Sequence, residues 1–371
     1  MTLQVVHFAS GDSWAGAEVQ LYELSCAMNR VSGVEATVVL LNEGILAERL
    51  REAGVGVTVI DEGRYHAGKI LVRLTRLLRR SRPHVVHTHR QKENVIGGIA
   101  ARLARVPCCL RTVHGAPEFS AVRLKQKLSR FMDLKTASLL QDAVVMVTDE
   151  LALRLKREYG SVRVEVIENG IRRPNIALRS TPLYARPDLV NVAFVGRLVP
   201  VKRVDVFAGI AKFCKDQGDR RFHFHVFGEG SGSALLEDQI KAEGTDDLIS
   251  RWGFVSDMPS ALAEMDVLVM TSDHEGLPMV MLEAMALHVP VVAHRVGGMI
   301  ETLDGGKAGI LVDTQSVSAF HKALVKASDT KVAERLSAEA FKRFETRYTA
   351  DACAKRTVDL YRDCVVSEPT G

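Results

Sequence analysis

Short runs of apolar residues alternate along the first half of the chain with longer segments whose apolar positions repeat at helical spacing. Such runs are typical of strands buried on both faces, and the segments between them predict the covering helices. This alternation favours a parallel sheet with helices on both sides. The predicted strands are Gln4–Ala9, Ala36–Leu41, Val57–Ile60, His84–His87, Cys109–Val113, Ala143–Val147 and Val164–Ile167.

A second series of the same kind follows a break in the pattern. Arg-Arg-Pro, Thr-Pro and Arg-Pro interrupt a polar stretch over 172–189, as in a linker. From about Asp329 the chain predicts helices without strands. We expect an α/β protein of two doubly wound, Rossmann-like domains, over residues 1–171 and 190–349. The later predicted strands are Val190–Gly196, Phe222–Phe227, Leu248–Gly253, Val267–Thr271, Val289–Ala293 and Gly309–Val312.

The segment His274–Ala286 carries the strongest chemical signal. Its carboxylates, Glu275 and Glu283, are eight positions apart, and Pro278 suits the first turn of a helix. The segment follows an apolar strand, so Glu275 is expected in the loop and Glu283 on the second helical turn. The amides near Leu277 to Val280 would face an anion. Acids beside an anion-binding helix start suit a ligand with both hydroxyls and phosphates, such as a sugar nucleotide.

Other unusual residues also follow predicted strands, where doubly wound sheets bind ligands. Two such rows of loops, one per domain, predict a cleft between the domains. Gly196-Arg197-Leu198 with Lys202 places two cations beside a helix start, where they could stabilise a leaving diphosphate or simply be surface charges. Gly228-Glu229-Gly230 lets a nucleotide approach the backbone but departs from a dinucleotide fingerprint.

The first half has weaker candidates. His114 precedes Gly115 at a strand end, where a ligand could come close to the backbone, although an isolated histidine is more often a packed core residue. His89 is interpreted as packing or as a contact on the acceptor side. Gly16 would let the first helix begin near a phosphate, and an ordinary turn explains it equally well.

Composition restricts the class of protein. The chain has 371 residues, of which 47% are hydrophobic and 25% charged, values typical of a soluble globular protein. No apolar run approaches the roughly 20 residues of a membrane helix, and the first residues read as a core strand rather than a signal peptide. The six cysteines lack metal-ligand spacing, so we expect reduced thiols in a cytoplasmic protein.

The charge is unevenly distributed. From Lys69 to Lys135 there are 16 Lys and Arg against three acidic residues. Much of this lies in Arg73–Arg82 and Arg123–Arg130, where leucines alternate with basic residues at helical spacing. Each segment could be a solvated helix face, and the pair could equally contact an anionic membrane surface. Nucleic acid is not expected as a partner, because no aromatic residues interleave with the basic ones.

In combination, these motifs resemble the retaining glycosyltransferases of family 4, which have the two-domain GT-B fold. The resemblance covers nearly the whole chain, and it is the order of the segments that makes it specific. They are Ala15–Glu18, Val85–His89, Thr112–Gly115, Val166–Ile171, Phe194–Leu198 with Lys202, Phe227–Gly230, Glu275 with Glu283, and Val296–Gly298 with Glu301.

The resemblance implies a role for each matching residue. Arg197, next to Gly196, and Lys202 would hold the donor diphosphate. Glu283 would bind the ribose hydroxyls, and Glu275 would face the donor sugar. The amides after Gly276, such as that of Leu277, would assist, and Pro278 belongs to the same binding segment.

Further roles are implied for both domains. His114 would touch the donor sugar near the reacting carbon. Phe254, Val255 and the Gly228 turn would frame the base, and Gly16 would approach the diphosphate or the acceptor. The last helix, about 350–371, would pack back on the first domain, leaving 190–349 as the donor domain and 1–171 as the acceptor side.

Two positions depart from the family pattern. Ala15 and Ala17 surround a single glycine, Gly16, so a ligand is predicted to approach the backbone less closely there. His288 stands where the family often has glycine. Both could alter donor or acceptor preference.

We therefore expect a retaining transfer from a nucleotide-diphosphate sugar to an acceptor hydroxyl, through an oxocarbenium-like transition state. The acceptor is expected to be a saccharide or lipid-linked saccharide of envelope, capsular or lipopolysaccharide synthesis, reached at the cytoplasmic face of the membrane. No Asp-x-Asp element argues for a metal, so no metal or separate cofactor is expected. The alternatives are an epimerase or phosphorylase of the same architecture, and a non-catalytic sugar-nucleotide-binding protein.

Overall fold

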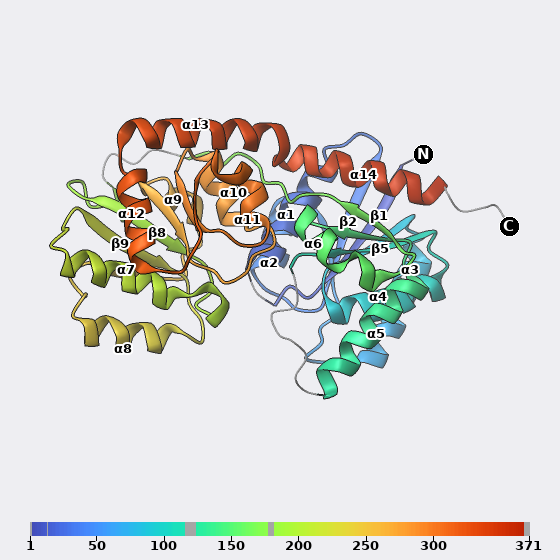
Figure 1. The fold of residues 1–371 in the computed structure, drawn as a ribbon. Coiled ribbons are helices and arrows are strands. Elements are labelled where there is room, and N and C mark those ends of the chain that lie inside the picture. The colour runs from blue at the N-terminus through green and yellow to red at the C-terminus, as the bar shows by residue number, and fades with distance from the viewer. Residues whose placement is uncertain (1, 13, 116–123, 177–181, 367–371) are drawn as a thin grey trace. The chain divides into compact units, whose positions relative to one another are not determined.

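A computed structural model describes residues 2–12, 14–115, 124–176 and 182–366, without the side chains of 124–129. Part of the predicted linker and part of the basic segment Arg123–Arg130 therefore lie outside the described residues. The chain forms two compact units, residues 1–172 with 349–371, and residues 173–348. Figure 1 shows the fold and labels many of the elements.

The first unit is built on a seven-stranded parallel sheet with the order β3-β2-β1-β4-β5-β6-β7. The strands are β1 (Leu3–Ala9), β2 (Val34–Leu40), β3 (Gly56–Val59), β4 (Val85–Thr88), β5 (Cys108–Val113), β6 (Ala143–Met146) and β7 (Arg163–Val166). The helices are α1 (Gly16–Met28), α2 (Ile45–Glu52), α3 (Ala67–Ser81), α4 (Gln91–Ala104), α5 (Leu124–Leu140), α6 (Asp149–Leu155), η1 (Lys156–Tyr159) and α14 (Ala350–Val366).

Helices cover both faces of this sheet, which is why its strands are apolar throughout. On one face, α14 packs beside α1 and buries Tyr361 completely. On the other, α3 and α4 bury Ile70, Leu74 and Leu78 against β1, β4 and β5. Figure 1 shows α3, α4 and α5 grouped together, in agreement with their mutual packing.

The C-terminal helix is anchored where two distant parts of the chain meet. Ile171 forms a bridge with Thr349, and the amide of Ala350 donates to the carbonyl of Ile171 at 2.9 Å. Arg356 on α14 pairs with the buried Glu168. A side chain at Gly170 would overlap the backbone carbonyl of Thr349. Gly170 is therefore needed for this close backbone contact.

The second unit has a six-stranded parallel sheet with the order β10-β9-β8-β11-β12-β13. The strands are β8 (Val190–Val195), β9 (Phe222–Phe227), β10 (Ile249–Gly253), β11 (Val267–Met270), β12 (Val291–His294) and β13 (Ile310–Val312). The helices are η2 (Pro200–Lys202), α7 (Val204–Asp216), α8 (Ser233–Glu243), α9 (Met258–Leu262), α10 (Met279–Ala286), α11 (Gly298–Thr302), η3 (Asp304–Gly306), α12 (Val317–Ala327) and α13 (Thr330–Arg347).

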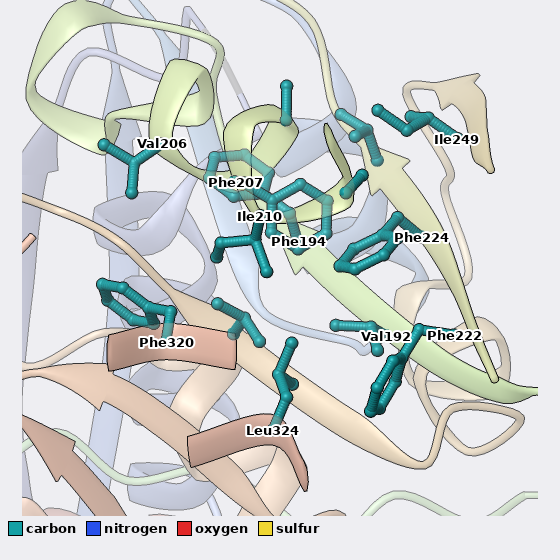
Figure 2. Close-up of a cluster of buried hydrophobic side chains, with 14 of the residues drawn as sticks. Val192, Phe194, Val206, Phe207, Ile210, Phe222, Phe224, Ile249, Phe320 and Leu324 are labelled. Atoms are coloured by element: carbon teal, nitrogen blue, oxygen red, sulfur yellow. The ribbon is translucent and has the colours of Figure 1, made fainter. Parts of the chain in front are cut away.

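Aromatic and branched side chains fill the core of this unit. Phe194 and Phe224 of the sheet meet Phe207 of α7, and the ring of Phe207 lies edge-on to that of Phe224 with centroids 5.4 Å apart. Phe320 and Leu324 of α12 close the same cluster (Figure 2). The two parallel sheets confirm the predicted fold class.

Several predicted boundaries move by one or two residues. The strand expected at Val289–Ala293 is β12, Val291–His294, because Val289 lies in the turn that ends α10. Pro278 was expected inside the first turn of a helix, but it is the N-cap of α10 with ψ of 127°.

No helix within the described residues combines the length and the apolarity needed to cross a bilayer.

We predict that Gly170→Ala lowers the free energy of unfolding by about 2 kcal/mol or more, because the added methyl group overlaps backbone atoms that cannot move independently. Urea unfolding followed by circular dichroism would measure the change. Gly68→Ala, in the first turn of α3, is the matched control, since its nearest neighbours would lie 3.4 Å away. Equal stabilities of the two variants would contradict the packing role of Gly170.

Candidate active site

In the second unit, the order of the strands reverses between β8 and β11. The chain proceeds from β8 to β9 and β10 on one side, and from β11 to β12 and β13 on the other. The loops after β8 and β11 therefore lie at a reversal of strand order, the position at which open α/β sheets generally bind ligands. Lys202 follows β8 and Glu275 follows β11.

Lys202 and Glu275 form an ion pair at this reversal. The Nζ atom of Lys202 contacts Oε1 of Glu275, which also accepts a hydrogen bond of 2.7 Å from Ser272 Oγ. Their side chains are 21% and 10% exposed, so the pair is largely withdrawn from water. An ammonium group held in this way remains close to solvent and can still attract an anion.

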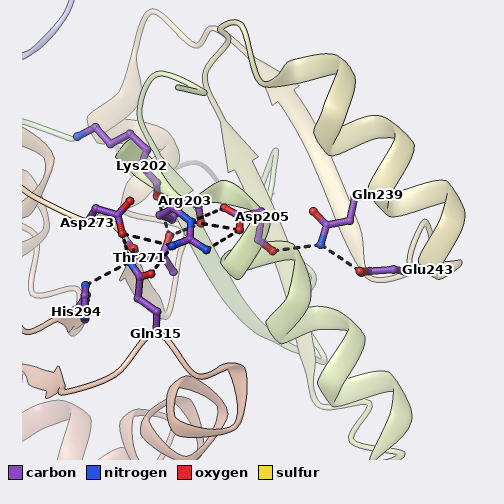
Figure 3. A network of polar contacts seen from close by, with 9 residues as sticks. All are labelled: Lys202, Arg203, Asp205, Gln239, Glu243, Thr271, Asp273, His294 and Gln315. Carbon is purple, nitrogen blue, oxygen red and sulfur yellow. Dashed lines mark hydrogen bonds and ion pairs between the residues drawn. The ribbon is translucent and has the colours of Figure 1, made fainter. Parts of the chain in front are cut away.

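A polar network fixes the backbone that carries Lys202. The Thr271 hydroxyl is 2.9 Å from the carbonyl oxygens of both Lys202 and Arg203. Arg203 has a φ of 52° and contacts Gln315 and Asp273. Figure 3 shows the Lys202 side chain extending away from this network. Motif spacing did not identify these supporting residues.

Glycines let neighbouring loops approach at the same edge of the sheet. A side chain at Gly228 would overlap the carbonyl oxygen of Gly196, and one at Gly230 would lie 2.5 Å from that of Leu198. Gly228 also donates from its amide to the Gly253 carbonyl at 2.7 Å. Two of these glycines, Gly196 and Gly228, have positive φ values of 151° and 127°. Their role is thus close backbone packing between loops.

The start of α10 completes the loop after β11. Gly276, Leu277 and Pro278 are buried, and Glu283 lies on the second turn, partly exposed. The carbonyl of Glu275 accepts from the amide of Gly298 at 3.1 Å, which ties this loop to the start of α11. Glu275 and Glu283 therefore occupy the loop and the helix, as expected from the sequence.

The remaining predicted residues of this unit lie at the ends of β8 and β10. Arg197 is exposed just after β8. Phe254 is 47% exposed and Val255 is partly buried after β10. Glu229 Oε1 accepts from the Phe254 amide at 3.4 Å and so links the two loops. Glu229 stood inside the glycine-rich turn of the sequence, but its link to Phe254 was not predicted.

The sheet of the first unit reverses between β1 and β4, and a cluster of histidines lies there. His7 of β1 is in register with His87 of β4, and His89 follows β4. His7 Nδ1 is 2.9 Å from His89 Nε2, and His89 Nδ1 is 3.3 Å from His114 Nε2. The structure therefore connects the predicted His114, through His89, to His7. The sequence analysis did not single out His7. Its polar ring within the otherwise apolar run Gln4–Ala9 is the feature that could have indicated it.

Burial keeps these rings neutral. It lowers the pKa of His7 from 6.5 to about 3 and that of His114 to about 4. Burial, followed by repulsion from the neighbouring histidines, also lowers the pKa of His87 and of His89. A small cavity of about 10 Å³, room for a single water molecule, borders His87, His89 and His114.

Three buried histidines are also a possible metal-ligand set. His7, His87 and His89 each offer a nitrogen within 4.8 Å of the others. However, the rings of His87 and His89 stack at 4.5 Å rather than converge. Both nitrogens of His87 also have partners, Tyr361 at 2.5 Å and Thr112 at 2.7 Å. The geometry fits a hydrogen-bonded cluster better than a metal site.

Gly16 lies beside a second polar group at this edge. It is exposed at the first position of α1. Glu18, on the same turn, is 4% exposed and pairs with Arg90, which also contacts Asp12 at 2.9 Å. Burial raises the pKa of Glu18, and Arg90 partly opposes this shift. The ion pair thus holds the loop after β1 against the loop after β4.

Two family models match the chain. Residues 14–173 match the model described as Glycosyltransferase Family 4, and residues 190–329 match that described as Glycosyl transferases group 1. A UDP-Gal:alpha-D-GlcNAc-diphosphoundecaprenol alpha-1,3-galactosyltransferase of Escherichia coli is 28% identical over 81% of this chain and 80% of its own. A 2-deoxystreptamine N-acetyl-D-glucosaminyltransferase of Streptomyces fradiae is 26% identical over 95% of this chain and 92% of its own.

Solved structures show the same fold. HepE of Anabaena, in complex with UDP-glucose, superposes with a TM-score of 0.81 at 19% identity and covers 97% of this chain and 100% of its own. At this identity the similarity establishes the GT-B fold alone.

The histidine cluster should make stability depend on pH. Above pH 6.5, His7 is neutral in both the folded and the unfolded chain. Between pH 6.5 and the pKa of His7 in the folded chain, about 3, only the unfolded chain takes up the proton, so the folded chain loses stability as the pH falls. His7 should therefore lower the free energy of unfolding by about 2 kcal/mol between pH 7 and pH 5.

Urea unfolding at the two pH values would measure this loss. His7→Phe should lose less stability than the wild type over the same interval, by about that amount. An equal pH dependence of both proteins would show that His7 takes up its proton in the folded state.

Proposed function

Because the chain belongs to the group 1, family 4 glycosyltransferases, we propose that it transfers a sugar from a nucleoside-diphosphate sugar to an acceptor hydroxyl with retention of anomeric configuration. UDP-hexoses are the first donors to test. Two similarities support this choice, since the relative from E. coli is named for UDP-Gal and the HepE structure contains UDP-glucose.

The observation that carries the proposal is the Lys202–Glu275 pair at the strand reversal of the second unit. In our proposal, the Lys202 ammonium and the Arg197 guanidinium bind the diphosphate and stabilise the charge that develops as it leaves. Glu275 orients Lys202 and accepts a hydrogen bond from a hydroxyl of the donor sugar. In the same proposal, the backbone amides at the start of α10 add donors for this anion.

The nucleoside would occupy the neighbouring loops. We assign Glu283 to the ribose hydroxyls, and Phe254, Val255 and the Gly228 turn to the base. Phe254 supports this role because about half of its surface is exposed beside the turn. The second unit is thus our proposed donor-binding domain.

The first unit would provide the acceptor side. We assign His114 to the donor sugar and Gly16 to the diphosphate or the acceptor. Gly16 is exposed at a helix start, where backbone amides are available to an anion.

In the reaction, the acceptor oxygen forms a bond to the anomeric carbon while the bond from that carbon to the diphosphate oxygen breaks. Both events occur on the same face of the sugar, which retains the configuration. The acceptor proton passes to the departing diphosphate. None of these steps needs a metal ion, since fixed cations balance the charge of the leaving group.

We further propose a lipid-linked saccharide as acceptor, in the assembly of a surface polysaccharide. The relative from E. coli acts, by its name, on a diphosphoundecaprenol-linked sugar. Such an acceptor lies at a membrane surface, and α3 and its neighbours present a suitable face. Arg73, Arg76 and Arg80 of α3 are exposed, and so are Leu103 of α4 and Phe131 of α5.

The proposal predicts release of nucleoside diphosphate from one donor of a UDP-, GDP-, ADP- and dTDP-sugar panel, unaffected by EDTA. Lys202→Ala and Arg197→Ala should each lower kcat on the order of 10²-fold, as for the loss of a group that stabilises a leaving anion. Steady-state release of the diphosphate measures both effects.

Lys212→Ala is the matched control, because Lys212 is paired with Asp216 on the surface of α7. It should keep wild-type turnover. Near-normal kcat in Lys202→Ala would remove Lys202 from the site, and turnover dependent on phosphate instead of an acceptor would indicate a phosphorylase.

The membrane surface is tested separately, with vesicles containing anionic lipid. We expect binding that weakens as salt is raised. Arg76→Glu with Arg80→Glu should weaken it by roughly 30-fold or more, since each basic residue near such a surface contributes about 1 kcal/mol.

The control is Lys212→Glu with Lys241→Glu, which reverses two paired surface charges of the second unit. Equal binding of the two double variants would show that α3 is an ordinary solvated helix face.

A further inference from the structure

Three histidines of the first unit form a linear chain of ring contacts. His7 Nδ1 faces His89 Nε2 at 2.9 Å, and His89 Nδ1 faces His114 Nε2 at 3.3 Å. His7 and His89 are 0% and 4% exposed, so bulk water does not compete for the contact between them. The nitrogens at the two ends, His7 Nε2 and His114 Nδ1, are buried and have no hydrogen-bond partner among the described residues.

A neutral imidazole carries one N–H and one bare nitrogen, so the chain allows only two arrangements. In the first, His7 donates to His89 and His89 donates to His114, which leaves the proton of His114 on Nδ1. In the second, every contact is reversed, and the proton of His7 is left on Nε2. The tautomers of the three rings are therefore linked, and the state of His114 depends on that of His7.

Burial favours the first arrangement. Each arrangement leaves one terminal N–H group without a partner among the described residues. His7 is 0% exposed and does not border the small cavity, so an N–H group at its Nε2 would have no acceptor, which is more costly than a bare acceptor nitrogen. His114 is partly exposed and borders that cavity, where a water molecule or a ligand oxygen can accept from its Nδ1. The rings stay neutral because burial lowers the pKa of each of them. The nearby His87 is held separately by Tyr361 and Thr112, so it does not interrupt the chain.

We propose that His7 and His89 are positioning residues that hold His114 with its proton on Nδ1, so that His114 donates a hydrogen bond to a hydroxyl of the bound sugar. The sugar ligand in this inference rests on the proposed function. The tautomers of the three rings do not, because they follow from the contacts between the rings. A histidine that donates from Nδ1 can recognise a hydroxyl oxygen, whereas the opposite tautomer could only accept from it.

The tautomers can be observed directly in the full chain labelled with ¹⁵N-histidine. Ring nitrogen shifts distinguish N–H from bare nitrogen, and single histidine variants assign the signals. The wild type should show a protonated Nδ1 at His114. His7→Phe keeps a ring of similar shape but removes the donor, so His114 should shift towards a mixture of tautomers. His7→Asn places an amide N–H near the former Nδ1 and should restore the wild-type pattern.

Kinetics give a second readout on the same variants. His7→Phe should lower kcat/KM for the donor about 10-fold, the low end of what losing a partner that orients a histidine costs elsewhere. His7→Asn should stay close to wild type. His225→Phe is the matched control, since His225 is a wholly buried strand histidine of the other unit, bonded to Asn191 and Trp252. It should leave the His114 tautomer unchanged.

The two readouts separate the two hypotheses. A bare Nδ1 at His114 in the wild type, or an unchanged His114 in His7→Phe, would overturn the histidine chain even in an active enzyme. A protein with the expected tautomers that turns over no nucleotide sugar would support the chain and reject the proposed function.

Discussion

The parallel pairing of strands is the constraint on which both candidate sites depend. Parallel strands end at the same edge of a sheet, and a reversal of strand order leaves two neighbouring loops running in opposite directions. This happens beside β1 in the first unit and beside β8 in the second. Residues far apart in sequence, such as Lys202 and Glu275, or His7 and His89, meet for that reason.

Electrostatics limits what the Lys202–Glu275 pair can add to stability, which agrees with the binding role that we propose for it. Two charges withdrawn from water lose hydration that their mutual attraction only partly returns. The Thr271 hydroxyl nevertheless holds the backbone of Lys202 and Arg203 in place, because it donates to both carbonyl oxygens. In our proposal, an anionic ligand takes over part of the contact that Lys202 makes with Glu275. A cation that is already held in place is well suited to such a ligand, because little reorganisation is needed when the ligand binds.

The sequence predicted the sheets well because their strands are buried on both faces and are therefore apolar throughout. It also singled out Glu275 and Lys202, whose motifs are local and which the structure brings into an ion pair. The histidine chain was only partly recognised, since a lone histidine in an apolar run does not reveal its neighbours on other strands. The support of Lys202 by Thr271 and Gln315 was not recognised for the same reason: contacts between loops depend on strand order, which periodicity does not define. Pro278 was misplaced by one position because a sequence pattern does not define the first residue of a helix to better than one or two positions.

The histidine cluster shows how the first unit combines a polar site with a buried core. Apolar residues at these positions would stabilise the sheet more simply, since burial opposes protonation of every ring. Neutral imidazoles, however, pack almost like aromatic side chains and still transmit a hydrogen-bond direction from ring to ring. His87 contributes to the packing by stacking on His89, while Tyr361 of α14 fixes its orientation. The C-terminal helix thereby supports the geometry of a site formed by residues more than 200 positions earlier in the chain.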